Sequence, residues 1–260
     1  MKKLLFLLLL AGSLTAGARE RKMTFTPASD AGIRFVGRAD KGTDGSLRFD
    51  WSGCYFTFRF EGRRCAMRAS DTGHNYYNIF IDGQPAGVVT TSRTDSTILL
   101  AGDLPRGPHT VLVQKRTEGE QGCTTLRGIE TDAPLLAAPA PRGRHIEFIG
   151  DSHTCGYGTE GRSVKEPFTP QTENCNLAWG CIIARYFDAD YTLIAHSGQG
   201  IVRNWGDPKE VSDCTMRERL LRTLDMDSTS RWNFSGYTPD IVVIKLGSND
   251  FSTDITPSEK

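Results

Sequence analysis

The sequence lacks an excess of either charge, since its 260 residues carry 31 Lys and Arg against 31 Asp and Glu. A protein that binds nucleic acid or an anionic membrane surface usually has a strong basic excess. We therefore expect no nucleic-acid partner. The composition, 38% hydrophobic and 24% charged residues, is ordinary for a globular protein, so disorder is not expected either.

Long hydrophobic runs are missing after the first residues, which excludes a membrane span by the usual length criterion. The chain begins with a basic Met-Lys-Lys, continues with the apolar run Leu4–Leu10 and then has small residues up to Ala18. This order is typical of a secretory signal peptide. We expect cleavage of residues 1–18 after Ala18, and a mature protein that is secreted or periplasmic.

The seven cysteines lack the paired spacing of a zinc site. They stand at positions 54, 65, 123, 155, 175, 181 and 214 and include no C-x-x-C pair, so no metal site is expected. Their odd number leaves at least one thiol without a partner in the chain. Pairs such as Cys54 with Cys65 or Cys175 with Cys214 stay open, as does burial of the thiols as small apolar side chains.

Short alternating runs fill the chain from about Ile33 to Ile129. Apolar and polar residues alternate at 47–51, 55–60, 77–81, 87–89 and 109–114. Turn signals separate these runs, among them Asp44-Gly45, Glu61-Gly62, Asp82-Gly83 and Arg106-Gly107-Pro108. Alternation of this density, with almost no helical pattern, predicts an antiparallel β-sandwich over residues 25–135.

A stretch rich in Pro and Ala ends this region, and we interpret residues 136–144 as a linker. From 145 to 260 apolar strands alternate with amphipathic helices. The predicted strands are 145–149, 191–195 and 241–246, and the predicted helices are 177–187 and 213–225. This alternation predicts an α/β domain in which a parallel sheet is covered on both faces.

Small and polar residues follow each of the three predicted parallel strands, at 150–158, 196–204 and 247–251. Ligands of open α/β sheets bind outside these carboxyl ends. There Ser152 could attack an ester carbonyl. Backbone N–H groups of Ser152 and of Gly200 (or Gly198), together with the Asn249 amide, could donate hydrogen bonds to the oxyanion.

These segments resemble the motif blocks of the SGNH, or GDSL-type, hydrolases, and within them carbohydrate esterase family 2. The resemblance lies in Ile149–Gly158, Ser197–Asn204 and Leu246–Ser252. It implies an N-terminal jelly-roll sandwich, a flavodoxin-like hydrolase domain, and no metal or organic cofactor. By resemblance Ser152 is the nucleophile, and Gly200 and Asn249 complete its oxyanion hole.

This sequence has no residue that matches the family's catalytic histidine. In the family that histidine lies in a late block, well beyond the Asn-Asp pair. The histidines of this chain, at 74, 109, 145, 153 and 196, all precede the third predicted strand. None suits a general base by position, and His196, at the end of a strand, is the least unsuitable. The strand Ile241–Ile244 also reads as one buried on both faces. We therefore expect a hydrolase domain that is incomplete at its C-terminus.

Other residues near the three blocks are expected to have supporting roles. Asp151 and Asp250 should hydrogen-bond the backbone of their loops. Trp205 is a candidate wall for an acyl group or a sugar face. Arg203 and Asn204 are further candidates for substrate contact.

The function implied by the resemblance is carbohydrate O-acetyl esterase, acting on plant polysaccharides such as xylan or mannan through an acyl-enzyme on Ser152. Without a histidine we expect weak or absent turnover. Two alternatives stay open: a carbohydrate-binding protein with impaired catalysis, and a serine esterase acting on peptidoglycan or lipid acyl groups. The sequence does not determine the sugar, the acyl position or the oligomeric state.

Overall fold

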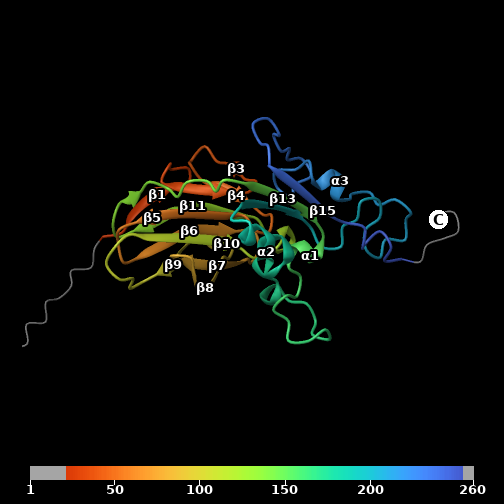
Figure 1. The fold of residues 1–260 in the computed structure, drawn as a ribbon, viewed down its shortest axis with the longest axis horizontal. Helices are drawn as coiled ribbons and strands as arrows, with labels where there is room; N and C mark the ends of the chain where they lie inside the picture. Colours follow the sequence, from red (N-terminus) through yellow and green to blue (C-terminus); the bar gives the residue numbers. More distant parts are fainter. Residues whose placement is uncertain (1–21, 254–260) are drawn as a thin grey trace, which may run out of the picture.

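The structure is a computed structural model that describes residues 22–253. Two antiparallel sheets form one half of the molecule and a small parallel sheet forms the other, as Figure 1 shows. The segment 1–18, for which a signal peptide is predicted, lies outside the described residues. Within residues 22–253 no helix is both long and apolar enough to cross a bilayer.

In the described residues twelve strands form two antiparallel sheets, which confirms the predicted antiparallel sandwich. The first sheet has the order β3-β4-β11-β6-β9, with β1 paired to β11. Its strands are β1 Thr24–Pro27, β3 Asp40–Lys41, β4 Leu47–Phe49, β6 Cys65–Asp71, β9 Ser96–Ala101 and β11 Thr124–Thr131. The second sheet has the order β12-β5-β10-β7-β8, with β2 paired to β5. Its strands are β2 Ile33–Val36, β5 Tyr55–Phe60, β7 Tyr76–Ile81, β8 Gln84–Thr90, β10 His109–Lys115 and β12 Leu135–Leu136.

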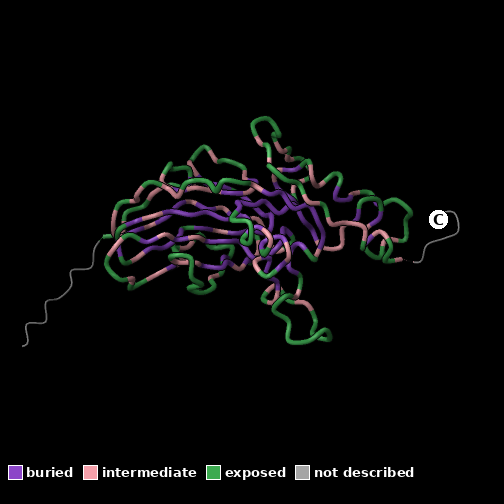
Figure 2. Tube along the Cα trace, viewed as in Figure 1, coloured by how far each residue is buried: buried purple, intermediate pink, exposed green. Residues whose placement is uncertain are grey.

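Alternation along β5 explains which face of the second sheet is buried in the sandwich. Phe56, Phe58 and Phe60 are at most 1% exposed and belong to the main core. Tyr55 and Thr57 lie on the other face, as successive side chains of a strand must. This outer face contacts the second half of the molecule, and Figure 2 shows the purple of buried residues running through both halves without a break.

The parallel sheet contains β13 His145–Gly150, β14 Asp190–Ala195 and β15 Ile241–Lys245 in the order β14-β13-β15. All three predicted strands are confirmed. Three short helices accompany them: α1 Ser152–Cys155, α2 Trp179–Tyr186 and α3 Met216–Arg219. Single 3-10 turns occur at η1 Gly119–Gln121, η2 Pro170–Thr172 and η3 Cys175–Leu177.

The helix predicted over 213–225 is wrong beyond its first turn. Thr215 and Glu218 form a capping box that starts α3, which ends at Arg219. The carbonyl groups of Leu220 and Arg222 then accept hydrogen bonds from the Arg38 guanidinium, which comes from the sandwich. A tertiary contact therefore replaces the next turns of the helix.

The two halves share a tight junction of buried polar contacts. Trp51 is fully buried and its Nε1 donates to the carbonyl of Thr223 at 3.0 Å. The Asp50 carboxylate accepts the backbone N–H groups of Asp225 and Met226 at 2.8 and 3.0 Å. Burial, then the charge of Asp225, raises the pKa of Asp50 to about 6.

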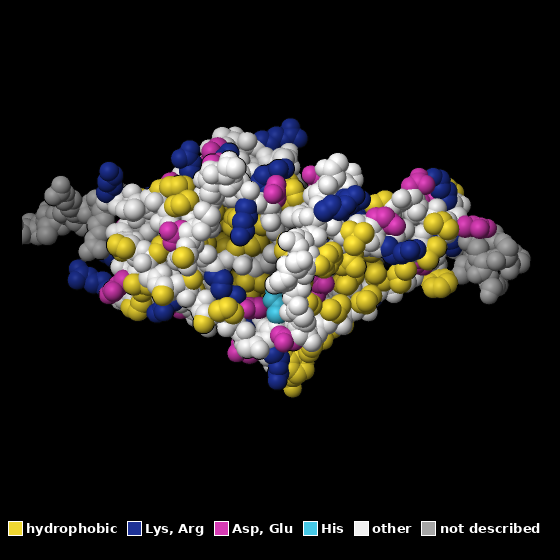
Figure 3. Space-filling view, turned by 90° about the horizontal axis from the view of Figure 1, so that it is seen from above, with side chains coloured by type: hydrophobic (Ala, Val, Ile, Leu, Met, Phe, Trp, Pro, Cys, Tyr) yellow, Lys and Arg dark blue, Asp and Glu magenta, His cyan; other side chains and the backbone are white. Residues whose placement is uncertain are grey.

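The strand β15 is the edge of the parallel sheet among the described residues. It was predicted to be buried on both faces, but Ile241, Val242 and Ile244 are 47, 49 and 62% exposed. Apolar side chains of this edge strand are therefore exposed among the described residues. Figure 3 shows hydrophobic side chains gathered on one face over the half of the molecule that holds the parallel sheet.

All seven cysteines are free thiols, and five of them are buried. The pairs Cys54 with Cys65 and Cys175 with Cys214, which the sequence left open, do not form. The buried thiols pack as small apolar side chains, which was the alternative to pairing. Burial raises the pKa of Cys54 to about 12, so this thiol stays protonated.

Candidate active site

The parallel register of the small sheet brings the three motif segments to one edge. Gly150 at the end of β13 pairs with Ala195 of β14 and with Lys245 of β15. The chain therefore leaves all three strands at the same side of the sheet. This side carries the Gly-Asp-Ser segment, the glycine segment and the Asn-Asp segment, as predicted.

Ser152 opens the one-turn helix α1 directly after β13. Asp151 is its N-cap, and the Asp151 carboxylate accepts the backbone N–H of His153 at 3.0 Å. The helix ends at Gly156, which has a left-handed φ of 80°. Asp151 also accepts a hydrogen bond from Lys245 Nζ at 3.1 Å, which ties the Ser152 turn to β15. The local backbone role predicted for Asp151 is confirmed.

Asp250 holds the glycine segment rather than its own loop, which corrects our expectation. Its carboxylate accepts the backbone N–H groups of Ile201, Val202 and Arg203 at 3.0, 2.7 and 3.1 Å. Burial opposes ionisation here, but these three N–H donors outweigh it and lower the pKa of Asp250. An ionised carboxylate at this point fixes the glycine segment against the Asn-Asp segment.

Asn249 and the two glycines are the donors predicted for an oxyanion. Asn249 is 8% exposed, and its Nδ2 donates to the carbonyl of Gln199 at 2.8 Å, which leaves a second N–H on that amide. The Gly200 N–H donates to Asn204 Oδ1 at 3.1 Å. For the Gly198 N–H, no acceptor occurs within residues 22–253. The structure thus brings Asn249 beside the glycine segment and leaves the Gly198 N–H available.

Glycine at position 200 has a packing reason that the sequence did not reveal. A Cβ there would lie 1.9 Å from the carbonyl oxygen of Arg203 and 2.7 Å from Asp250 Oδ2. The turn that Asp250 holds would not close around a larger residue. Gly198 has a left-handed φ of 75°, but a Cβ there would have nothing nearer than Trp205 Cβ at 3.9 Å.

None of the five histidines hydrogen-bonds Ser152 in the part of the chain that the structure describes. His196, the least unsuitable by position, has Nδ1 2.6 Å from Asp225 Oδ2 and Nε2 3.2 Å from Glu120 Oε1. Burial opposes its charged form, but hydrogen bonds to Asp225 and Glu120 raise the pKa of His196 to about 9. Both ring nitrogens are engaged and the ring is cationic, so His196 is unsuited to act as a base.

The other four histidines contact residues other than Ser152. His153 points its ring to Asp151 and Lys245. His145 Nε2 lies 2.8 Å from Thr192 Oγ1 at the amino end of the sheet. His109 Nδ1 lies 2.7 Å from Asp82 in the sandwich. His74 stacks edge-on against Tyr76, also in the sandwich.

Sequence reasoning missed a buried cluster behind the nucleophile turn, made by Glu118, Cys155 and Glu173. Glu118 leaves the sandwich after β10, and its carboxylate accepts the backbone N–H of Ser197 at 2.7 Å and faces the Cys155 thiol at 3.7 Å. The Glu118 N–H donates to Glu173 Oε2 at 3.2 Å. The only signal was a Thr-Glu-Gly-Glu run at 117–120, which reads as an ordinary solvated loop.

The ligand atoms of this cluster lie within 4.8 Å of one another, close enough to hold a metal ion. Burial, with the negative charge of Glu118, raises the pKa of Glu173 to about 9, and burial raises that of Cys155 well above its ordinary value.

Trp205, the candidate substrate wall, follows the glycine segment and is 70% exposed. Its backbone N–H donates to the carbonyl of Gly198 at 2.8 Å, which places it directly beside the proposed oxyanion donors. Arg203 is buried and donates to the carbonyl of Asp250. Asn204 donates to the carbonyl of Cys214 at 2.7 Å. Both residues therefore hold loops, and neither is free for substrate contact in this arrangement.

Comparisons with known proteins agree with the two halves of the molecule. Residues 35–141 match the family described as Carbohydrate esterase 2 N-terminal, and residues 146–260 match the GDSL-like Lipase/Acylhydrolase family. A curated relative, Cellulase/esterase CelE of Acetivibrio thermocellus, is 37% identical over 90% of this chain and 29% of its own length. An acetylxylan esterase / glucomannan deacetylase of Cellvibrio japonicus is 33% identical over 83% of this chain and 59% of its own length. The chain thus spans less than two thirds of either curated relative.

A solved structure of a family two carbohydrate esterase from Clostridium thermocellum, in complex with cellohexaose, is also similar. It is 38% identical, with a TM-score of 0.81, over 86% of this chain and 68% of that chain. The two family matches include both halves, and the range 146–260 contains Ser152 and Asn249. The chain therefore belongs to carbohydrate esterase family 2.

Proposed function

We propose that this protein is a carbohydrate O-acetyl esterase that removes acetyl groups from plant polysaccharides such as xylan or mannan. One observation carries the proposal: the register of β13, β14 and β15 brings Ser152, the glycine segment and Asn249 to one edge of the sheet. The relatives named for acetylxylan and glucomannan deacetylation support the choice of substrate. The reaction needs no metal or organic cofactor.

In the proposed reaction Ser152 Oγ attacks the acetyl carbonyl and the sugar hydroxyl leaves with a proton. Water then attacks the acetyl-serine and releases acetate. The N–H of Ser152, a glycine N–H and the Asn249 amide stabilise the negative oxygen at each tetrahedral stage, each such donor being worth about 2.7–4 kcal/mol. If Gly200 is the glycine donor, its N–H must give up its hydrogen bond to Asn204 in order to bind the oxyanion. Among the described residues, the Gly198 N–H has no such bond to give up.

Several finer features belong to the same proposal. The strand orders β4-β11-β6-β9 and β5-β10-β7-β8, with consecutive strands β4 to β7 alternating between sheets, support a jelly roll over residues 25–135. The order β14-β13-β15 supports a flavodoxin-like sheet in a hydrolase domain from 145 to 260, joined through a linker at 136–144. A signal peptide at 1–18 and secretion to a polysaccharide substrate complete it. Trp205 would wall the acetyl or sugar side of the site.

The test is acetate release from acetylated xylan and acetylated glucomannan by the 260-residue chain and by its Ser152→Ala variant. We expect release that is slow, because no histidine side chain in residues 22–253 hydrogen-bonds Ser152, and that is lost in the variant. Equal release by both proteins would overturn the assignment of Ser152. Release from acylated peptidoglycan or lipid but from neither polysaccharide would favour the rival serine esterase.

A carbohydrate-binding function is the second candidate, because the histidine side chains within residues 22–253 have partners other than Ser152. A protein of this type would bind polysaccharide at the same edge without turning it over. Binding of xylan or glucomannan, unchanged by Ser152→Ala and accompanied by no acetate release even with an added base, would favour it.

A further inference from the structure

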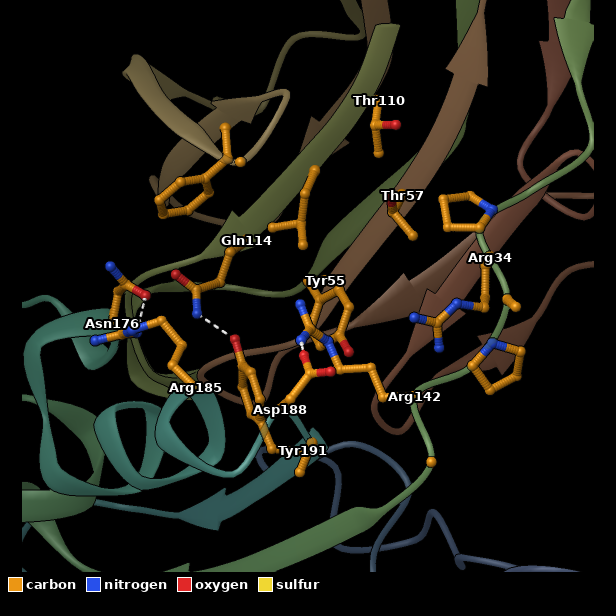
Figure 4. A pocket seen from close by; sticks show the side chains of 18 residues that line it. Arg34, Tyr55, Thr57, Thr110, Gln114, Arg142, Asn176, Arg185, Asp188 and Tyr191 are labelled. Atoms are coloured by element: carbon orange, nitrogen blue, oxygen red, sulfur yellow. Dashed lines mark hydrogen bonds and ion pairs between the residues drawn. The ribbon is translucent and has the colours of Figure 1, made fainter.

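A cavity lies at the junction between the sandwich, the linker and the parallel sheet. Its volume is about 590 Å³, within the range of small-molecule sites. The outer face of the second sheet forms its floor, with Thr57, Thr110 and Leu112, while Pro139–Gly143 and the end of α2 form its walls. Figure 4 shows side chains from these three sources converging on the cavity.

This cavity is distinct from the candidate active site. The residues that it takes from the parallel sheet, Ala189 and Tyr191, stand at the amino end of β14. Ser152 follows the carboxyl end of the neighbouring strand β13, which pairs in parallel with β14 along its whole length. Six residues of strand span roughly 17 Å, so a ligand of one sugar unit would not touch both sites.

The charges that line the cavity leave one cation without a counterion. Arg34 pairs with Asp190 at 2.9 Å, and Arg142 pairs with Asp188. The third, Arg185 on α2, has no carboxylate within 4 Å in the part of the chain that the structure describes. Its Nη1 donates to the side-chain oxygen of Asn176 at 2.6 Å. The lining therefore carries one net positive charge at Arg185.

The polar groups around Arg185 are donors. After the bond to Asn176, the guanidinium retains N–H groups with no acceptor among residues 22–253, and so does the Asn176 side-chain amide. Figure 4 places both on the same side of the cavity, with Gln114 and Tyr191 next to them. Gln114 is already satisfied, since its Oε1 accepts from Asn78 and its Nε2 donates to Tyr191. A planar fork of donors fits a carboxylate.

Apolar side chains also line the cavity. Phe80 and Leu112 are partly exposed, and Pro139 and Pro141 of the linker lie in the same lining. Apolar rings and branched side chains can pack against the C–H face of a pyranose, whereas a small free anion has no apolar surface to contact them. The cavity thus combines one anchor for a negative charge with an apolar surface of ring size.

We propose that this junction cavity binds a sugar unit that carries a carboxylate, such as a uronic acid side group of a polysaccharide, with Arg185 and Asn176 as the carboxylate anchor. The choice of a sugar rests on the proposed function. The binding itself does not need Ser152. The cavity would hold an acidic branch of the polymer while acetyl groups elsewhere on it reach the active-site edge.

The test compares two matched probes on the full chain by isothermal titration calorimetry: xylotriose that carries one glucuronic acid, and unsubstituted xylotriose. Neither probe is acetylated, so the result does not depend on esterase activity. We expect the acidic probe to bind about tenfold more tightly at low salt and to lose this advantage as salt is added.

Three variants locate the site. Arg185→Gln should abolish the preference for the acidic probe, and Asn176→Asp should do the same by giving Arg185 an internal counterion. Arg217→Gln removes the same charge from an exposed position on α3 and should keep the preference. Equal affinity for the two probes, or a preference that survives Arg185→Gln, would overturn the proposal. Competition by free acetate as effective as that by glucuronate would show that the cavity takes carboxylates without recognising the sugar, which would overturn it too.

Discussion

The Glu118 carboxylate accepts the backbone N–H of Ser197 at 2.7 Å, although Glu118 follows the sandwich strand β10 and Ser197 begins the glycine segment after β14. Glu118 is 1% exposed, and the same carboxylate faces the Cys155 thiol in α1. Glu118, which follows a sandwich strand, therefore contacts both the nucleophile turn and the proposed oxyanion loop. The two halves of the protein are one structural unit at this point.

Removing this acceptor should destabilise the protein. Glu118→Ala leaves the partly buried Ser197 N–H without its acceptor, which costs about 1–3 kcal/mol. Glu118→Gln keeps one carbonyl oxygen for that N–H and should cost clearly less. Urea unfolding of the two variants checks this, and equal losses for Ala and Gln would show that the contact with Ser197 carries no stability.

Asp250 should control the mobility of the glycine segment. Asp250→Ala removes the shared acceptor of Ile201, Val202 and Arg203, and hydrogen bonds to a charged group are worth about 1.5–3 kcal/mol. We expect amide hydrogen exchange at these three positions to accelerate by tenfold or more, with a smaller effect for Asp250→Asn. Unchanged exchange in the Ala variant would mean that another contact holds the segment.

His196 should make the stability of the junction depend on pH. Its pKa rises to about 9 in the native protein, against about 6.5 in an unfolded chain. Because the native pKa is the higher one, its contribution is complete below pH 6.5 and is lost as the pH rises through 9. Each pH unit of this difference is worth about 1.4 kcal/mol, so we expect a loss of roughly 3 kcal/mol.

Urea unfolding of the native chain and of His196→Gln, at several values between pH 6 and 9.5, measures that slope. The variant should unfold more easily at pH 6 and approach the native chain at pH 9.5. The control is His153→Gln, since the His153 side chain is 65% exposed. A constant difference between His196→Gln and the native chain across this range would contradict the assignment of a cationic His196.

Glu173 should penalise folding at neutral and higher pH. Burial and the charge of Glu118 raise its pKa to about 9, so the native state holds a proton that the unfolded chain has released above pH 4.5. Glu173→Gln resembles the protonated carboxyl in shape and needs no proton. We expect this variant to match the native chain near pH 4 and to be more stable at pH 8, measured by thermal unfolding. Glu210→Gln, at an exposed position, should change neither, and a variant that is less stable at pH 8 would mean that Glu173 is ionised.

Much of the architecture could be predicted from the hydrophobic periodicity and the turn residues of the sequence. The alternation of Phe56, Phe58 and Phe60 predicts the buried face of β5. Asp82-Gly83 predicts the turn between β7 and β8, where both residues have positive φ. The three strand ends follow from parallel strands alone. The early end of the helix expected at 213–225 could not be predicted, because Arg38, more than 180 residues away along the chain, binds the carbonyls that would have extended the helix.

The supporting residues of the site were harder to predict than its motifs. Ser152 and Asn249 stand in recognisable segments, whereas Glu118 and Glu173 stand in loops whose charge reads as solvated. Their burial depends on the packing of the sandwich against the sheet, and no local pattern encodes that packing. The junction cavity has the same origin, since Arg185 meets Thr110 and Pro139 only after both halves have folded.

The central claim is that Ser152 is an acetyl-accepting nucleophile without a histidine partner in the described chain. The most direct measurement is the rate of acetate release from acetylated xylan by the 260-residue chain as imidazole is added. Imidazole can supply the missing base to the exposed side of Ser152, so we expect the rate to rise with its concentration, beyond the rate of Ser152→Ala in the same buffer. An identical response to imidazole in the native chain and in Ser152→Ala would contradict the claim.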